Sequence, residues 1–108
     1  MYWSRAVAYL QTHYQDPTLT TAQLAQELYA SREHLSRAFK ERTMESIHNY
    51  LIYLRMQHCR KALEEGVSVL NACTESGFPD YSSFLKTFRR LYSITPAEYR
   101  AQHRTMVR

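Results

Sequence analysis

Two stretches of the chain place basic and hydroxyl side chains on one face of a predicted helix, opposite an apolar face. Leu35 and Phe39 are the apolar anchors of the first stretch, and Phe84 and Phe88 are those of the second. The outward residues are Arg32, Glu33, Ser36, Arg37 and Lys40 in the first stretch, and Tyr81, Ser82, Ser83, Lys86 and Arg89 in the second. Such side chains can hydrogen-bond to the base edges and phosphates of duplex DNA. A solvated face explains any single cation, but its repetition favours a nucleic-acid surface.

Residues suited to other chemistry are present without the spacing that the chemistry needs. His58 and Cys59 are adjacent, so on a helix their side chains point about 100° apart and do not easily share a metal ion. No cysteines or histidines have the spacing typical of a zinc site. The chain has no nucleophile elbow, and Gly66 and Gly77 are too far apart for a phosphate-binding glycine loop. We therefore expect a protein that is not an enzyme and that needs no metal or other cofactor.

The positive charge is concentrated in the second half of the sequence. The chain has 108 residues and a formal net charge of +4. Residues 1–54 contain 5 basic and 5 acidic residues, whereas residues 55–108 contain 9 and 5. The whole positive excess therefore belongs to the second half, which predicts a stronger attraction to an anionic partner there.

Length and composition indicate a small cytoplasmic protein. A chain of this length suffices for one domain. Its longest apolar run, residues 50–54, is much shorter than the roughly 20 residues needed to cross a membrane. The N-terminus lacks the pattern of a secretory signal, and two cysteines fit a reducing compartment. We expect no membrane association.

Helix-start and helix-stop signals divide the chain into seven predicted helices. The first covers residues 2–14 and is broken by Asp16-Pro17. Each of the other six begins at a residue type that favours the N-cap position. These N-caps are Thr20, Ser31, Ser46, Ser68, Asp80 and Thr95. Gly66 and Gly77 end two of the helices.

The pattern of caps, apolar anchors and cations occurs twice. When residues 20–42 are laid against residues 68–91, Leu35 falls on Phe84 and Arg37 on Lys86. The offset is 48 before the turn and 49 after it. Each copy is predicted to be a short helix, a tight turn and a second helix that fits the major groove. The alternative is that any two amphipathic helix pairs look alike.

The segment between the two copies is long enough to join two DNA-binding helices. Residues 46–65 form a predicted helix of 20 residues, about 30 Å in length. Successive major grooves on one side of B-DNA are roughly 34 Å apart. A single chain could therefore contact two adjacent major grooves without forming a dimer.

The last third of the chain contains a recognisable motif, made of Gly77-Phe78, Tyr81-Ser82-Ser83-Phe84, Phe88-Arg89-Arg90 and Thr95-Pro96-Ala97-Glu98-Tyr99-Arg100. Through this motif the chain resembles the DNA-binding domain of the AraC/XylS family. Upstream, Leu24-Ala25, the run from Ser31 to Lys40, Tyr50-Leu51 and Arg55 agree with the same family. The similarity extends over nearly the whole chain.

The resemblance implies an all-α, homeodomain-like fold with two helix-turn-helix subdomains joined by a long central helix. The corresponding boundaries are 1–45 for the first subdomain, 46–65 for the linker helix and 66–108 for the second. The implied function is sequence-specific binding to duplex DNA in bacterial transcription regulation, most often activation. In the family, the second helix of each unit enters the major groove.

The resemblance also assigns roles to individual residues. Family base-reading positions fall on Glu33, Ser36, Arg37, Tyr81, Ser82, Ser83 and Lys86. The candidate phosphate contacts are Arg32, Lys40, Arg60, Arg89 and Arg90. Arg37 and Lys86 can bond to guanine, and Glu33 can accept from cytosine.

The sequence departs from the family pattern at two glycine positions. Tyr29 and Met44 stand where the family usually has Gly. If either backbone needs a positive φ, the side chain costs on the order of 1 kcal/mol. Cys59 and Cys73 stand where the family often has Ala, so we expect both in the core.

The expected partners are promoter DNA and RNA polymerase. If the chain is a piece of a longer protein, an N-terminal effector or receiver domain is expected as well. A helical module for protein partners alone is the alternative to DNA binding.

Overall fold

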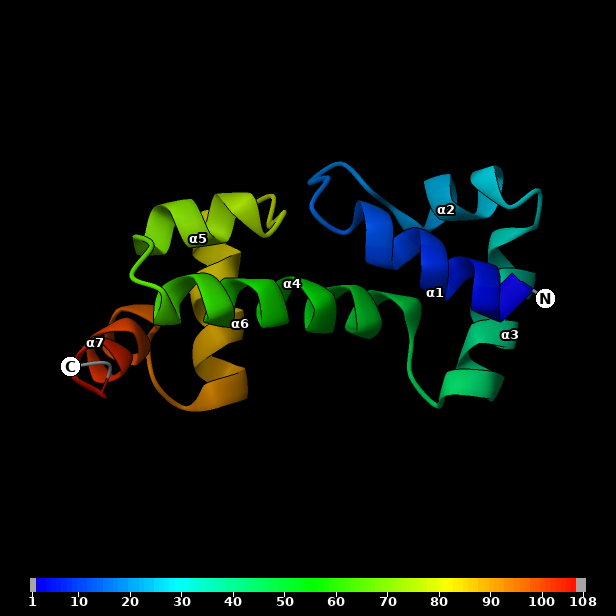
Figure 1. Ribbon diagram of the computed structural model, residues 1–108. Helices are drawn as coiled ribbons and strands as arrows, with labels where there is room; N and C mark the ends of the chain where they lie inside the picture. The colour runs from blue at the N-terminus through cyan, green and yellow to red at the C-terminus, as the bar shows by residue number, and fades with distance from the viewer. Residues whose placement is uncertain (1, 107–108) are drawn as a thin grey trace. The chain divides into compact units, whose positions relative to one another are not determined.

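The computed structural model describes residues 2–106, and every regular element in this range is a helix (Figure 1). The helices are α1 (Tyr2–His13), α2 (Thr21–Glu27), α3 (Arg32–Thr43), α4 (Ile47–Glu64), α5 (Val69–Glu75), α6 (Tyr81–Tyr92) and α7 (Pro96–Met106). The predicted all-α fold with seven helices is confirmed. None of these helices is both long and apolar enough to span a bilayer.

The predicted N-caps make the hydrogen bonds that begin each helix. Thr20 Oγ1 accepts from the Gln23 amide at 3.1 Å, and the Gln23 side chain accepts from the Thr20 amide, which completes a capping box. The side chains of Ser31, Ser68 and Asp80 cap α3, α5 and α6 by accepting from the amide three residues on. The hydroxyls of Ser46 and Thr95 also accept from the amide three residues on. Local sequence therefore determines where these helices start.

The contacts between residues divide the chain into two compact units, residues 1–54 and 55–108. The division falls within α4, which the sequence assigned to a linker. α4 gives Ile47 and Leu51 to the first unit and Met56 and Leu63 to the second, all of them buried. The subdomain boundaries at residues 45 and 66 stay an interpretation of the family resemblance.

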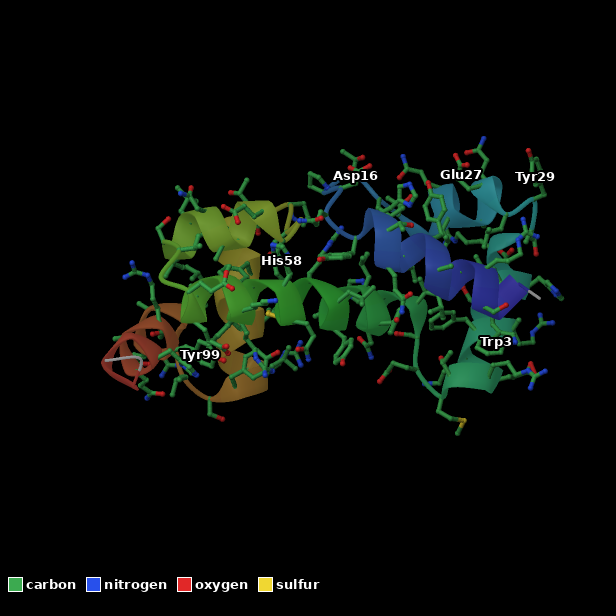
Figure 2. All side chains as sticks on the ribbon, viewed as in Figure 1. Trp3, Asp16, Glu27, Tyr29, His58 and Tyr99 are labelled. Carbon is green, nitrogen blue, oxygen red and sulfur yellow. The ribbon has the colours of Figure 1, made fainter. Side chains whose placement is uncertain are left out.

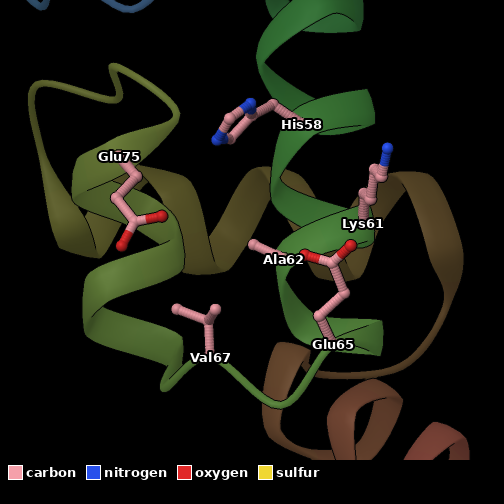
Figure 3. A pocket seen from close by; sticks show the side chains of 6 residues that line it. All are labelled: His58, Lys61, Ala62, Glu65, Val67 and Glu75. Carbon is pink, nitrogen blue, oxygen red and sulfur yellow. The ribbon is translucent and has the colours of Figure 1, made fainter.

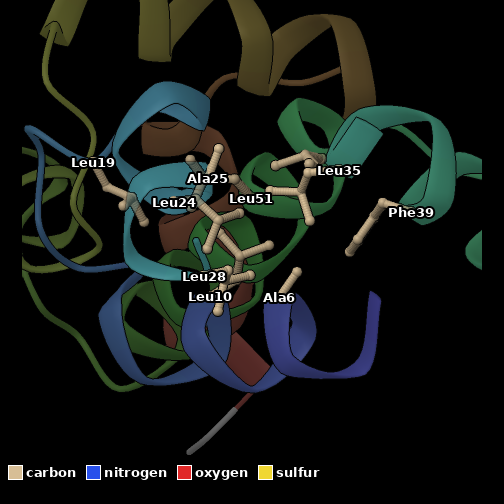
Figure 4. Close-up of a cluster of buried hydrophobic side chains, with 10 residues drawn as sticks. Ala6, Leu10, Leu19, Leu24, Ala25, Leu28, Leu35, Phe39 and Leu51 are labelled. Carbon is tan, nitrogen blue, oxygen red and sulfur yellow. The ribbon is translucent and has the colours of Figure 1, made fainter. Parts of the chain in front are cut away.

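The first unit is built around a cluster of apolar, mostly aliphatic side chains from α1, α2, α3 and the start of α4 (Figure 4). Ala6 and Leu10 of α1, Leu24 of α2 and Leu35 and Phe39 of α3 are almost fully inaccessible to solvent. Burial of this kind is the main stabilising contribution to a small helical fold. The core fixes α2 and α3 as a helix-turn-helix pair.

The second unit has an aromatic core. Phe84 and Phe88 of α6 are buried, and the Phe78 ring lies 4.9 Å from the Phe84 ring. Phe88 makes edge contacts with Tyr92 and with Tyr99 of α7, at 4.8 and 5.7 Å between centroids. These contacts hold α6 against α7.

Cys59 and Cys73 also lie in this second core, as expected. Burial first, and the nearby Cys73 second, raise the pKa of the Cys59 thiol to about 12. Both thiols are free, and their raised pKa values keep them protonated and unreactive.

Within residues 2–106, three residues with side chains adopt the left-handed backbone conformation. Tyr29, Met44 and Ser93 have φ values of 55°, 63° and 66°. Tyr29 lies in the turn of the first helix-turn-helix, and Met44 ends α3. Both backbones thus keep the positive φ that glycine accepts more readily, so the strain considered from the sequence is present.

Candidate nucleic-acid interface

Helix α3 presents a polar face to solvent. Leu35 and Phe39 are buried beneath it, as the apolar spacing predicted. The predicted base-reading and phosphate-contacting residues of this helix are all exposed; they are Arg32, Glu33, Ser36, Arg37 and Lys40. The Ser31 hydroxyl accepts from the His34 amide at 3.1 Å and fixes the start of the helix. The anchors and the cap thus hold the polar face in place.

Helix α6 repeats this arrangement. Phe84 and Phe88 are buried, and the predicted contact residues on the helix are exposed; they are Tyr81, Ser82, Ser83, Lys86, Arg89 and Arg90. The Tyr81 ring packs 6.1 Å from that of Phe84 and stays 41% exposed. The structure therefore gathers the sequence-predicted residues on the second helix of each unit, with Arg60 as the exception.

The start of α6 is fixed by a side-chain pair. The Asp80 carboxylate accepts from the Ser83 amide at 2.9 Å and also from the Ser83 hydroxyl. The hydrogen bond from the Ser83 side chain is the largest cause that lowers the pKa of Asp80, followed by the bond from the Ser83 amide. Asp80 is therefore a carboxylate at neutral pH, at the end of a helix where negative charge is stabilised.

Arg60 lies on α4 in a separate environment. Its guanidinium carbon is 4.9 Å from the centroid of the Tyr92 ring. Its Nε atom is buried and has no hydrogen-bond partner among the described residues. Hydrogen bonding to Tyr92 is the first of the causes that raise the pKa of Arg60. Arg60 is thus tied to α6 by an intramolecular contact, and its phosphate contact stays a prediction.

A network beside Arg60 holds α7 against the end of α4. The Tyr99 hydroxyl donates to the Glu64 carboxylate. Burial is the first cause that raises the pKa of Tyr99, and the bond to Glu64 is the second. Arg100 donates from Nη2 to the Gly66 carbonyl at 2.8 Å and from Nε to the Val67 carbonyl at 3.0 Å. From the sequence, Tyr99 and Arg100 were only part of the family motif. In the structure both residues position α7.

One further cation near the first polar face was missed from the sequence. Arg42 is exposed on the last turn of α3, and its guanidinium carbon lies 5.8 Å from the centre of the Trp3 ring system. The contact is a cation–π pair between α1 and α3. The helical spacing of α3 does not predict this contact, because Trp3 lies 39 residues earlier in the sequence.

The second unit also has a shallow pocket of about 330 Å³. Figure 3 shows its lining residues, His58, Lys61, Ala62, Glu65, Val67 and Glu75. They belong to α4, α5 and the connection between them. No group of three or more metal-ligating side chains occurs in the part of the chain that the structure describes. None of the predicted DNA-contact residues lines this pocket.

The fold agrees with the comparison to known proteins. A sequence model described as "Helix-turn-helix domain" matches residues 24–102. The chain belongs to the AraC-type helix-turn-helix family. This is a family of DNA-binding transcriptional regulators, so the expectation that the chain is not an enzyme is confirmed.

Curated relatives of this AraC-type chain are transcription regulators. It is 29% identical over 102 residues to the HTH-type transcriptional regulator ArgR of Pseudomonas aeruginosa, covering 94% of this chain and 31% of that protein. It is 30% identical over 96 residues to the lactose operon transcription activator of Staphylococcus xylosus, covering 88% of this chain and 34% of that protein. The chain spans about a third of the length of these relatives.

Solved structures match the AraC-type chain over almost its whole length. The DNA-binding domain of AdpA in complex with a target DNA has a TM-score of 0.88 and 28% identity, covering 96% of this chain and 94% of that one. The C-terminal domain of the two-component response regulator yesN of Fusobacterium nucleatum has a TM-score of 0.85 and 26% identity, covering 90% and 95%. The fold is that of DNA-binding domains of this type.

Proposed function

We propose that this chain binds duplex DNA sequence-specifically by inserting α3 and α6 into adjacent major grooves. The observation that carries the proposal is that both helices have the same design. Each has 12 residues, a polar N-cap, two buried anchors and an exposed face of polar and basic side chains. A helix of this kind fits the major groove, with residues near its N-terminus meeting the base edges.

The length of α4 supports the use of two grooves by a single chain. α4 is an uninterrupted helix of 18 residues, which corresponds to about 27 Å. Adjacent major grooves on one side of DNA lie roughly 34 Å apart. A helix that contributes residues to both units and has about this length is compatible with both units contacting one duplex.

The base-reading roles follow from the chemistry of each exposed side chain. Arg37 and Lys86 donate to guanine O6 and N7, and Arg37 can do so with two parallel bonds. Glu33 accepts from the amino group of cytosine. The remaining base-contacting residues are Ser36, Tyr81, Ser82 and Ser83.

The phosphate contacts supply affinity without sequence preference. Arg32, Lys40, Arg89 and Arg90 are exposed cations on α3 and α6, and Arg60 is the candidate on α4. Each phosphate neutralised by a cation releases counterions, so DNA affinity falls as salt is raised.

Activation is the direction of regulation that we favour, with RNA polymerase as a second partner. The similarity to the lactose operon transcription activator of S. xylosus supports activation. The similarity to the C-terminal domain of the response regulator yesN supports an N-terminal receiver or effector domain in the whole protein. The expected location is the bacterial cytoplasm, on the nucleoid.

Selection of bound duplexes from a random DNA pool tests the proposal. The expected result is an enriched site with two conserved segments, one for each recognition helix, about one helical turn apart. Affinity for that site, measured by fluorescence anisotropy, should fall linearly on logarithmic axes as salt is raised. Failure to bind any duplex at low salt would overturn the proposal and leave a module for protein partners.

A further inference from the structure

The hydroxyl of Ser83 has a fixed direction in the structure. Its proton is donated to the carboxylate of Asp80, the N-cap of α6. The same carboxylate oxygen, Oδ2, accepts from the Ser83 backbone amide at 2.9 Å. Ser83 is thus held to Asp80 at two points while its side of the helix stays exposed to solvent.

This pairing decides which hydrogen bonds the two residues can still form. A serine hydroxyl has one proton and two lone pairs, and an ionised carboxylate has lone pairs only. Asp80 has no proton to donate at neutral pH, because the same bonds lower its pKa below the ordinary value of an aspartate. With the single proton used, Ser83 and Asp80 offer only acceptors to an approaching molecule.

We propose that Ser83 reads its DNA base as a hydrogen-bond acceptor, and so selects adenine or cytosine on the strand that it faces. In the major groove, adenine presents the N6 amino group and cytosine the N4 amino group, whereas guanine and thymine present acceptors at O6, N7 and O4. An acceptor-only pair is matched by the amino groups and repelled by the carbonyl oxygens. This inference rests on the proposed insertion of α6 into the major groove.

The first unit does not share this feature. Its N-cap is Ser31, whose hydroxyl accepts from the amide of His34, and His34 is the residue at the position of Ser83. A hydroxyl N-cap can both donate and accept. The acceptor-only rule therefore applies to the second recognition helix alone.

The test uses base analogues in a duplex taken from the random-pool selection. Each adenine in the segment bound by α6 is replaced in turn by purine 2′-deoxyriboside, and each cytosine by a 2-pyrimidinone nucleoside, which removes only the amino group. One such replacement should weaken binding of the native chain about 2- to 10-fold, the effect of one hydrogen bond. Ser83→Ala should bind that analogue duplex and its parent equally.

Two further variants give the experiment its controls. Ser93→Ala changes an exposed serine at the other end of α6, which is not a predicted DNA contact, and should keep the sensitivity to the missing amino group. Asp80→Ser gives α6 a serine N-cap, the residue type that caps α3, and serine is a good capping residue. It leaves Ser83 able to donate, so binding of guanine or thymine at the same position should improve relative to the native chain. Thermal unfolding followed by circular dichroism verifies that each variant is folded.

Three results would overturn the inference. The first is a preference for guanine or thymine that depends on Ser83. The second is that removing each amino group weakens binding of Ser83→Ala as much as binding of the native chain. The third is unchanged discrimination in Asp80→Ser. If the chain still selects a site that depends on Arg37 and Lys86, the proposed function stands and only this inference fails. If no duplex is selected at all, both fail.

Discussion

Tyr29 and Gly77 occupy equivalent places in the two helix-turn-helix turns, and both have a positive φ, 55° and 94°. The surrounding hydrogen bonds are also equivalent. The amide of Ala30 donates to the Ala25 carbonyl at 3.0 Å, and in the second unit the residue after Gly77 makes the same bond at 3.3 Å. The turn geometry is thus kept even where the glycine is not.

We expect Tyr29→Gly to stabilise the protein by up to about 1 kcal/mol, because it relieves a left-handed conformation at a residue with a Cβ atom. The side chain is 89% exposed, and Figure 2 shows it extending away from the ribbon, so little packing is lost. Chemical denaturation measures the change. Tyr29→Ala retains the Cβ atom and should give no comparable gain. Equal stability of the Gly and Ala variants would show that the turn is not strained.

Arg37→Ala and Lys86→Ala should each lose about 1–3 kcal/mol of discrimination at one base pair. Arg37 should act on the segment bound by α3, and Lys86 on the segment bound by α6. Competition binding with single-base variants of the selected site measures this loss. A weakening that is the same for all duplexes would instead make these residues phosphate contacts.

Arg60→Ala should lower the free energy of unfolding by about 1 kcal/mol, because it removes the cation over the Tyr92 ring. Arg89→Ala is the matched control, since Arg89 is exposed and its removal should change stability by less than about 0.5 kcal/mol. Unchanged stability of Arg60→Ala would contradict the importance of the stacking.

The same two variants test the phosphate contacts. Loss of one contact should reduce the slope of log affinity against log salt by about 0.9. We expect this reduction for Arg89→Ala and for Arg60→Ala. If the slope of log affinity against log salt in Arg60→Ala equals that of the native chain, the phosphate contact predicted for Arg60 is contradicted and its role is purely structural.

Alkaline pH should destabilise the fold through Cys59. Its pKa is raised by burial from 9.0 to about 12, so the folded state keeps the thiol proton that the unfolded chain loses. The contribution to stability is complete below about pH 9 and is lost as the pH rises toward 12. Denaturation at a series of pH values should show a smaller decline for Cys59→Ala than for the native chain. Identical declines would contradict the assignment to Cys59.

The fold could be predicted from the sequence because its signals are local. The N-caps act within three residues, and the anchors Leu35, Phe39, Phe84 and Phe88 follow the helical period. The exposed faces of α3 and α6 are the other sides of the same helices. Most predicted contact residues therefore lie where the sequence put them.

Most of the features that were not predicted depend on contacts between distant segments, and one depends on the direction of a local hydrogen bond. The type of residue 55 alone does not decide whether this arginine is buried, and the structure shows Arg55 to be 4% accessible. Arg60 was predicted only as a candidate phosphate contact, and its stacking on the ring of Tyr92, 32 residues later, was not predicted. The donation from Ser83 to Asp80 is local, yet its direction follows from side-chain geometry that residue types alone do not fix.

The division of α4 between two hydrophobic cores also constrains how this protein can be taken apart or recombined. Ile47 and Leu51 belong to one core, and Met56 and Leu63 to the other, along one continuous helix. A protease that cuts α4 between Leu54 and Arg55 leaves each core its own buried residues but shortens the helix that carries them. Exchange of one unit between relatives must therefore carry a matching portion of this helix with it.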